Sequence, residues 1–185
     1  MDLRDAIYGR RAVRDYLRKP VEQSVIKSLI DAAVQAPSAV NQQPWIFTVV
    51  RDERVLDQLS RESKEHMLRF HPGIKDSEHF HVLNDPHFQI FYHAPALIII
   101  AAVAPVPWFV EDCSLAAQNL MLAAHEARLG SCWIGFAQGY LNTPEGKALV
   151  GLSPACAPVA PIIIGEPRSE PKAVARKEPQ IRWVG

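Results

Sequence analysis

The chain has 185 residues, of which 48% are hydrophobic and 22% charged, a composition typical of one globular domain with a core of its own. Lys plus Arg and Asp plus Glu each number 20, and this balance argues against a general nucleic-acid binder, which normally carries a basic excess. The three cysteines are widely spaced without a CxxC pair, so we expect neither structural disulfides nor a zinc knuckle, and we predict a cytoplasmic protein.

The first half of the chain predicts two helices, a strand and a third helix. Residues 2–9 form a short helical pattern. Residues 22–36 place apolar side chains at i, i+3, i+4 spacing, which predicts an amphipathic helix that Pro37 ends. Residues 45–51 are rich in β-branched and aromatic side chains, as strands are. Residues 52–70 predict a polar helix with a thin apolar stripe.

The middle of the chain combines an irregular segment with a buried strand. Residues 71–93 show no clear period, and we predict an irregular, lid-like segment. Residues 95–104 are a continuous apolar run, which favours a strand covered on both faces. Three prolines interrupt the longer apolar stretch 94–110, so we expect no membrane span, and the charged start of the chain predicts no signal peptide.

The last part predicts two helices, a strand and an extended tail. Residues 111–130 form a strong helical pattern with Gly130 at the expected C-cap, and 131–136 predict a short strand or turn. Thr143 and Pro144 predict the start of a short helix. Residues 158–167 read as a buried strand, whereas 166–185 have too little apolar content to form a core. The expected organisation is one domain over 1–185, with helices interleaved with about three buried strands.

Two basic clusters lie near opposite ends of the chain. Arg10, Arg11 and Arg14 fall within five residues, and Arg176 and Lys177 lie in the tail. Arginine offers a planar fork of donors suited to phosphate. The two clusters therefore form either one phosphate site or separate solvated patches.

The loop 36–45, APSAVNQQPW, is rich in uncharged hydrogen-bonding groups. Ser38, Asn41, Gln42 and Gln43 lie between two prolines, where a solvated loop would more often use Gly or charged residues. This composition indicates a rigid loop that contacts a neutral polar ligand.

Other common sites are absent from the sequence or weakly supported. There is no GxxxxGK[ST], GxGxxG or GxSxG motif, so a P-loop, a dinucleotide-binding Rossmann fold and a hydrolase nucleophile elbow are not predicted. Five histidines cluster without a metal-ligand motif, which favours surface or lid histidines over a metal site: His71, His79, His81, His87 and His93.

Four segments together resemble the nitroreductase family of flavoproteins. They are RRAVRDY (10–16), APSAVNQQPWIFTVV (36–50), LGSCWIG (129–135) and RKEPQIRWVG (176–185), in the family's order and across nearly the whole chain. The resemblance implies an α+β fold with a mixed central β-sheet wrapped by helices. It also implies a homodimer with FMN at the interface and a C-terminal tail that extends over the partner subunit.

The resemblance assigns cofactor-binding roles to residues in these segments. The residues that match the family's phosphate contacts are Arg10, Arg11 and Arg14, together with Arg176 and Lys177 of the tail. The loop that contacts flavin from the partner subunit is matched by Pro37, Ser38, Asn41 and Gln43. The loop that faces flavin N5 and O4 is matched by Trp133, Ile134 and Gly135. No protein nucleophile is expected, because flavin N5 carries the hydride. Ala12 replaces the family's common Ser, so one hydroxyl contact to the cofactor is missing.

The activity implied by the resemblance is an FMN-dependent reduction. NADH or NADPH would supply hydride, in a ping-pong reaction, to a small electron-poor acceptor such as a nitroaromatic or quinone. Residues 66–93 match no clear family pattern, and in the family this region often shapes the substrate pocket. The alternatives are a specialised flavin reaction on the same fold, such as dehalogenation or flavin fragmentation, and a non-catalytic FMN-binding protein.

Overall fold

The protein is built around one antiparallel sheet of four strands. The computed structural model describes residues 1–71, 73 and 80–185. The strands are β1 (Trp45–Val50), β2 (Ala96–Ala102), β3 (Gly130–Trp133) and β4 (Ala157–Gly165), in the spatial order β1-β2-β4-β3. Every neighbouring pair in this sheet runs antiparallel. We expected a sheet with both parallel and antiparallel strands. Within the described chain, the parallel pairing is limited to an isolated bridge between Ala12 and Ser131.

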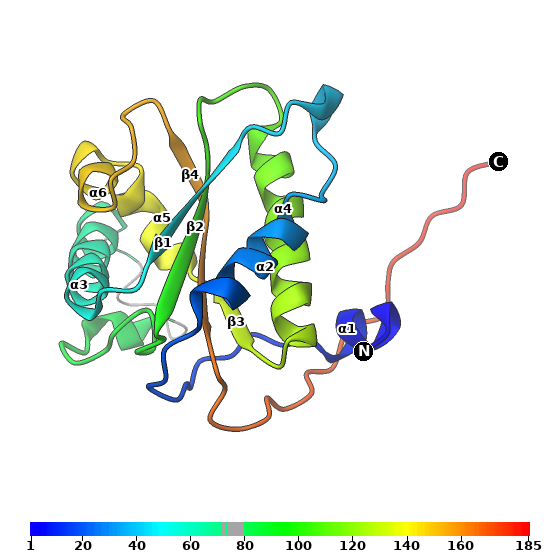
Figure 1. Ribbon diagram of the computed structural model, residues 1–185, viewed down its shortest axis with the longest axis horizontal. Helices are drawn as coiled ribbons and strands as arrows, with labels where there is room; N and C mark the ends of the chain where they lie inside the picture. Colours follow the sequence, from blue (N-terminus) through cyan, green and yellow to red (C-terminus); the bar gives the residue numbers. More distant parts are fainter. Residues whose placement is uncertain (72, 74–79) are drawn as a thin grey trace.

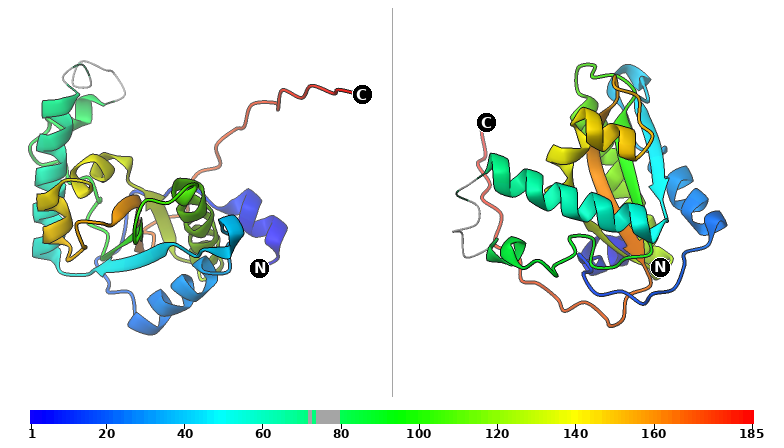
Figure 2. Two further views of the ribbon diagram at one scale, coloured as in Figure 1. Left: turned by 90° about the horizontal axis from the view of Figure 1, so that it is seen from above. Right: turned by 90° about the vertical axis from the view of Figure 1, so that its left-hand side faces the viewer.

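Helices cover both faces of the sheet (Figures 1 and 2). One face packs against α2 (Gln23–Ala33) and α4 (Phe109–Glu126), and the other against α3 (Glu53–Phe70), α5 (Gly135–Leu141) and α6 (Pro144–Leu149). The short α1 (Leu3–Gly9) packs near α4. All seven residues of β2 are buried, which explains their continuous apolar run, because a central strand between two helical layers has no solvent-facing side.

Local capping explains where several helices begin. Asp52 caps α3, with its carboxylate accepting hydrogen bonds from the Arg54 and Val55 N–H groups. Thr143 caps α6 and Pro144 takes the first helical position, as predicted. None of the helices in the described chain is long and apolar enough to cross a lipid bilayer.

Two predicted helix ends were wrong. α2 ends at Ala33 rather than at Pro37, so residues 34–38 already form the approach to the loop. Gly130 is not a C-cap: α4 ends at Glu126, and Arg128 adopts the left-handed conformation with φ 59°. Gly130 instead opens β3, where a Cβ atom would lie 2.7 Å from Val13 Cβ. Glycine is required there by a close approach of two chain segments.

The two irregular regions differ in their contacts. Within 71–93, a 3₁₀ turn spans His81–Asn84, and the Lys64 ammonium donates to the carbonyls of Asp85 (2.7 Å) and Phe88 (2.9 Å). Beyond β4, residues 170–185 form no regular element and are exposed. In Figure 1 this tail runs away from the sheet.

The contact between Gly130 and Val13 gives a stability prediction. Gly130→Ala should destabilise the fold by about 1–3 kcal/mol, because the new methyl group overlaps a buried side chain. Adding Val13→Ala should recover part of this loss, because it removes Cγ1 and Cγ2, two of the three overlapping atoms. Chemical denaturation of the single and double variants measures both effects. Gly73→Ala is the control, since no described atom lies within 4 Å of a Cβ built there; equal losses in Gly130→Ala and Gly73→Ala would contradict the packing role.

Candidate functional site

Arginines from both ends of the chain line one cleft of about 520 Å³. The segment after α1 leaves the helix in extended conformation and pairs with β3, with Val13 N–H donating to the Ser131 carbonyl at 3.0 Å. The tail crosses the same segment, because Leu17 N–H donates to the Glu166 carbonyl at 2.9 Å. These two pairings gather the basic residues of the cleft: Arg10, Arg11, Arg14, Lys172 and Arg176.

The positive charges of this cleft, here called the arginine cleft, are poorly compensated. Burial and the neighbouring charges of Arg11 and Arg176 lower the pKa of Arg10 from its ordinary value. Among the described residues that line the cleft, Asp15 is the one carboxylate, and it already accepts a bond from Arg168 Nε at 3.1 Å. Arg11 donates twice through Nη1, to the carbonyls of Tyr8 (2.7 Å) and Arg10 (2.8 Å).

One donor of Arg11 is left over in this arrangement. Its Nε is buried and has no hydrogen-bond partner among the described residues. A guanidinium keeps its charge at any physiological pH, so converging arginines repel one another until an anion binds between them. The donor set fits a phosphate group, which accepts several charge-assisted hydrogen bonds at once.

A tyrosine and a cysteine lie beside Arg14. Burial raises the pKa of Tyr92, while the Arg14 charge and a hydrogen bond from Arg14 partly oppose this rise. Burial also raises the pKa of the Cys132 thiol, against the opposing charges of Arg14 and Arg10. Both groups are therefore neutral near pH 7, and neither is an activated nucleophile.

The segment that follows β3 continues the strand that pairs with Ala12. Trp133 ends the strand, and Ile134 N–H donates to the Pro161 carbonyl at 2.8 Å. Gly135 opens α5 and is exposed, with no described atom near its Cβ direction. Since the first N–H groups of a helix have no partner within it, this position offers an open donor to a ligand.

The amide-rich loop lies at the other end of α4. Ala39 N–H donates to Asp112 Oδ1 at 2.9 Å, in the first turn of α4, whereas His125, near the end of α4, contacts Gly9 of α1. Thirteen residues separate Asp112 from His125, a rise of about 20 Å along the helix axis. Figure 1 shows α1 and the turn before β1 at opposite ends of α4. The loop and the arginine cleft of one chain therefore do not meet.

The predicted site residues thus divide into two groups. Arg10, Arg11, Arg14 and Arg176 line the cleft together. The range 133–135 lies at and just after the end of the strand that pairs with Ala12. Pro37, Ser38, Asn41 and Gln43 form the separate loop, and Lys177 does not line the cleft. Sequence reasoning missed Lys172, Tyr92 and Asp112. Lys172 was detectable as a third cation of the tail, but Tyr92 lay in a segment without periodicity.

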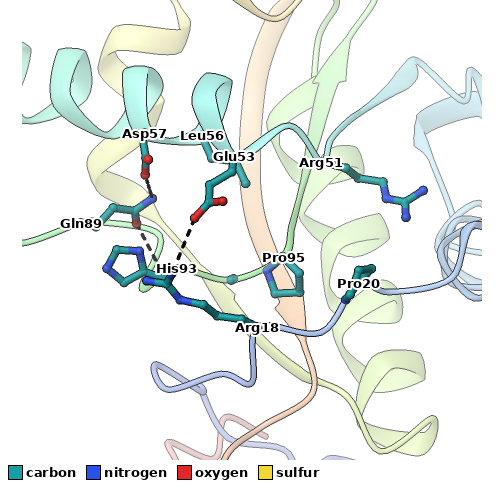
Figure 3. A pocket seen from close by; sticks show the side chains of 10 residues that line it. Arg18, Pro20, Arg51, Glu53, Leu56, Asp57, Gln89, His93 and Pro95 are labelled. Carbon is teal, nitrogen blue, oxygen red and sulfur yellow. Dashed lines mark hydrogen bonds and ion pairs between the residues drawn. The ribbon is translucent and has the colours of Figure 1, made fainter.

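The histidine cluster does not form a metal site in the described part of the chain. No group of three or more His, Cys, Asp or Glu side chains is placed to hold an ion there, and His79 lies outside the described residues. His93 lines a different pocket of about 340 Å³ (Figure 3), which none of the predicted site residues lines. In that pocket Arg18 points toward Glu53, with 3.7 Å between the charged atoms.

Similarity to known proteins decides the family. The family model described as the nitroreductase family matches residues 7–165. The chain belongs to the nitroreductase family. A protein named as a candidate NADH dehydrogenase/NAD(P)H nitroreductase of Methanothermobacter thermautotrophicus is 34% identical over 139 residues, 73% of this chain and 61% of the relative. A protein of the same name from Archaeoglobus fulgidus is 30% identical over 89% of this chain and 84% of its own length.

Two further proteins are similar to this chain in structure or in sequence. The structure of a nitroreductase with bound FMN from Bacteroides fragilis superimposes with a TM-score of 0.86 and 25% identity, covering 100% of both chains. The iodotyrosine deiodinase of Thermotoga neapolitana is 31% identical over 70% of this chain and 71% of its own. The α+β fold expected from the sequence is therefore confirmed.

The buried cysteines predict slow reaction with thiol reagents. Burial raises the pKa of Cys132, and it raises that of Cys113 to about 12. Because a raised thiol pKa keeps the thiolate scarce at pH 8, the native protein should react at least about 100-fold more slowly than the unfolded chain. A colorimetric disulfide-exchange assay with and without denaturant measures both rates. Rapid release of one equivalent from the native protein would contradict the prediction.

Proposed function

We propose that this protein is an FMN-dependent oxidoreductase that transfers hydride from NADH or NADPH to an electron-poor acceptor such as a nitroaromatic or a quinone. The observation that carries the proposal is the arginine cleft, where Arg10, Arg11, Arg14 and Arg176 line one cavity. Family membership and a structural neighbour that holds FMN support it. Bound FMN would supply reversible hydride transfer at its N5 atom.

The chain's own residues bind and orient this cofactor. The four arginines would hold the phosphate, and the buried Arg11 Nε would gain an acceptor from it. The exposed backbone at Gly135 would face the ring, whereas the partly buried side chain of Trp133 packs against the core on the side of α2 and α4. None of these groups forms a bond to the substrate, in keeping with the neutral Tyr92 and Cys132 beside Arg14.

We propose a homodimer in which the loop of one subunit completes the flavin site of the other. The loop is bonded to Asp112 and α1 contacts His125, and the rise of about 20 Å along α4 between these two residues supports this assignment. Apolar side chains left exposed also support it, because they need a covering surface. They lie on the loop, on α4 and on the tail, which we expect to extend over the partner: Val40, Val110, Leu115, Ile181 and Trp183. We further propose a cytoplasmic location, since the three cysteines are free.

Reductive dehalogenation is a second candidate activity. The similarity to an iodotyrosine deiodinase over most of this chain favours it. Both candidates use the same cofactor, so they differ in the acceptor alone. A halogenated tyrosine and a nitroaromatic, tested as acceptors under the same anaerobic conditions, distinguish them.

The spectrum and reduction of the purified protein test the proposed function. The protein should show flavin absorbance near about 375 and 450 nm, because a phosphate-anchored cofactor survives purification. Anaerobic NADH or NADPH should bleach these bands, and a quinone or nitroaromatic should restore them. A colourless protein that takes up no added FMN would contradict the proposal, whereas bound flavin that neither nucleotide reduces would indicate a non-catalytic binder.

The phosphate assignment gives a sharper prediction. Arg10→Ala combined with Arg176→Ala should weaken FMN binding by at least about 100-fold, because a charge-assisted hydrogen bond is lost at each site. Riboflavin, which lacks the phosphate, should bind the double variant and the parent protein equally. Fluorescence titration measures all four affinities, and circular dichroism verifies the fold. Equal losses for FMN and riboflavin would place the phosphate elsewhere. Arg18→Ala, in the other pocket, is the matched control.

A further inference from the structure

We infer that Asp112 is a positioning residue that holds the amide-rich loop, residues 38–43, in the conformation needed to contact flavin. The inference deepens the proposed function and rests on it for the identity of the ligand. Asp112 lies in the first turn of α4 and is only 3% exposed. Its Oδ1 atom accepts the Ala39 N–H at 2.9 Å and so joins the loop to the sheet-packed helix.

The loop held by this bond has an unfavourable backbone. Val40, Asn41 and Gln43 have φ angles of 45°, 56° and 48°, all in the left-handed region. Asparagine tolerates that region, but a β-branched residue is a true outlier there. Val40 is also 85% exposed, so packing within this chain does not offset its strain. Such strain persists only where surrounding contacts impose it.

Few contacts of the loop impose this conformation. Within the loop, Ser38 Oγ accepts the Gln43 N–H at 2.9 Å, and Gln43 Nε2 donates to Asn41 Oδ1 at 3.1 Å. Both of these bonds would move with the loop if it swung as a unit. The hydrogen bond from Ala39 to Asp112, by contrast, joins residues 38–43 to another element of the described chain through a side chain. It therefore fixes the loop's position relative to α4.

The second oxygen of Asp112 argues against a general stabilising role. Oδ2 is buried and accepts no hydrogen bond from the residues that the structure describes. A buried carboxylate with an unused oxygen is costly, and the N-terminus of α4 compensates it only in part. The arrangement is instead explained by the one bond that Oδ1 makes to the strained loop.

The test compares Asp112→Ala with a matched control on the same helix turn. Glu111→Ala removes an exposed carboxylate from the first turn of α4 and leaves the loop contact intact. Asp112→Ala should weaken FMN binding at least about tenfold, because the loop loses its anchor. Glu111→Ala should change it less than about threefold, and Asp112→Asn, which keeps an acceptor oxygen, should restore most of the affinity.

A second substitution in the loop separates positioning from folding. Glycine adopts left-handed φ angles without strain, so Val40→Gly removes the strain of the conformation that Asp112 has to impose. Asp112→Ala with Val40→Gly should therefore bind FMN more tightly than Asp112→Ala alone. A merely structural role for Asp112 would not produce this rescue. If Asp112→Ala fails to fold, Ala39→Pro deletes the same hydrogen bond from the loop side, and Ser38 already has the extended conformation that precedes proline.

Hydrogen exchange gives a readout that does not depend on flavin. In the protein without added ligand, the amides of 39–43 should exchange at least about tenfold faster in Asp112→Ala than in Glu111→Ala. If the wild type binds no flavin, the proposed function fails while exchange still decides whether Asp112 anchors the loop. Unchanged exchange in Asp112→Ala, or equal loss of FMN affinity in the Asp112 and Glu111 variants, would overturn the inference.

Discussion

The repulsion among arginines in one cleft is the constraint on which the site depends. Arg10 and Arg11 follow α1, and Arg176 arrives from the tail, so the chain brings like charges together across most of its length. Burial and the neighbouring charges already lower the pKa of Arg10. An anion bound between the guanidinium groups would offset this repulsion and accept charge-assisted hydrogen bonds. Two backbone pairings bring these arginines together. Residues 12–13 pair with β3, and residues 16–17 pair with residues 166–167.

The amide-rich loop lies far from that cleft, and this separation is the reason for proposing a flavin site shared by two subunits. α4 spans the distance, with the loop bonded to its first turn and α1 packed near its last. A loop fixed in a strained conformation by a buried carboxylate has a defined geometry before any ligand arrives. We propose that a second subunit supplies the cleft toward which this loop is directed, so that each flavin contacts both chains.

Much of the fold follows from local patterns, whereas the errors arise from long-range packing. The spacing of Val25 to Val34 predicted α2, and the apolar run before Val103 predicted β2, because each pattern reflects burial within one element. Gly130 was misassigned as a C-cap, since its need for a small side chain comes from Val13, more than a hundred residues away in sequence. Asp112 was missed for a related reason: an acidic residue in a first helical turn is ordinarily explained by the helix dipole. The partner of Asp112, Ala39, is a backbone group that leaves no mark on the sequence.

The most direct test of a site shared between subunits is complementation. One subunit type carries Arg10→Ala and Arg176→Ala, and the other carries Ser38→Ala and Asn41→Ala, so that neither homodimer has a complete site. The two are unfolded and refolded together, and bound FMN is measured in the mixture. The account predicts that FMN binding returns in the mixture, because each mixed dimer pairs one intact cleft with one intact loop. A mixture that binds no more FMN than the separate variants would contradict it.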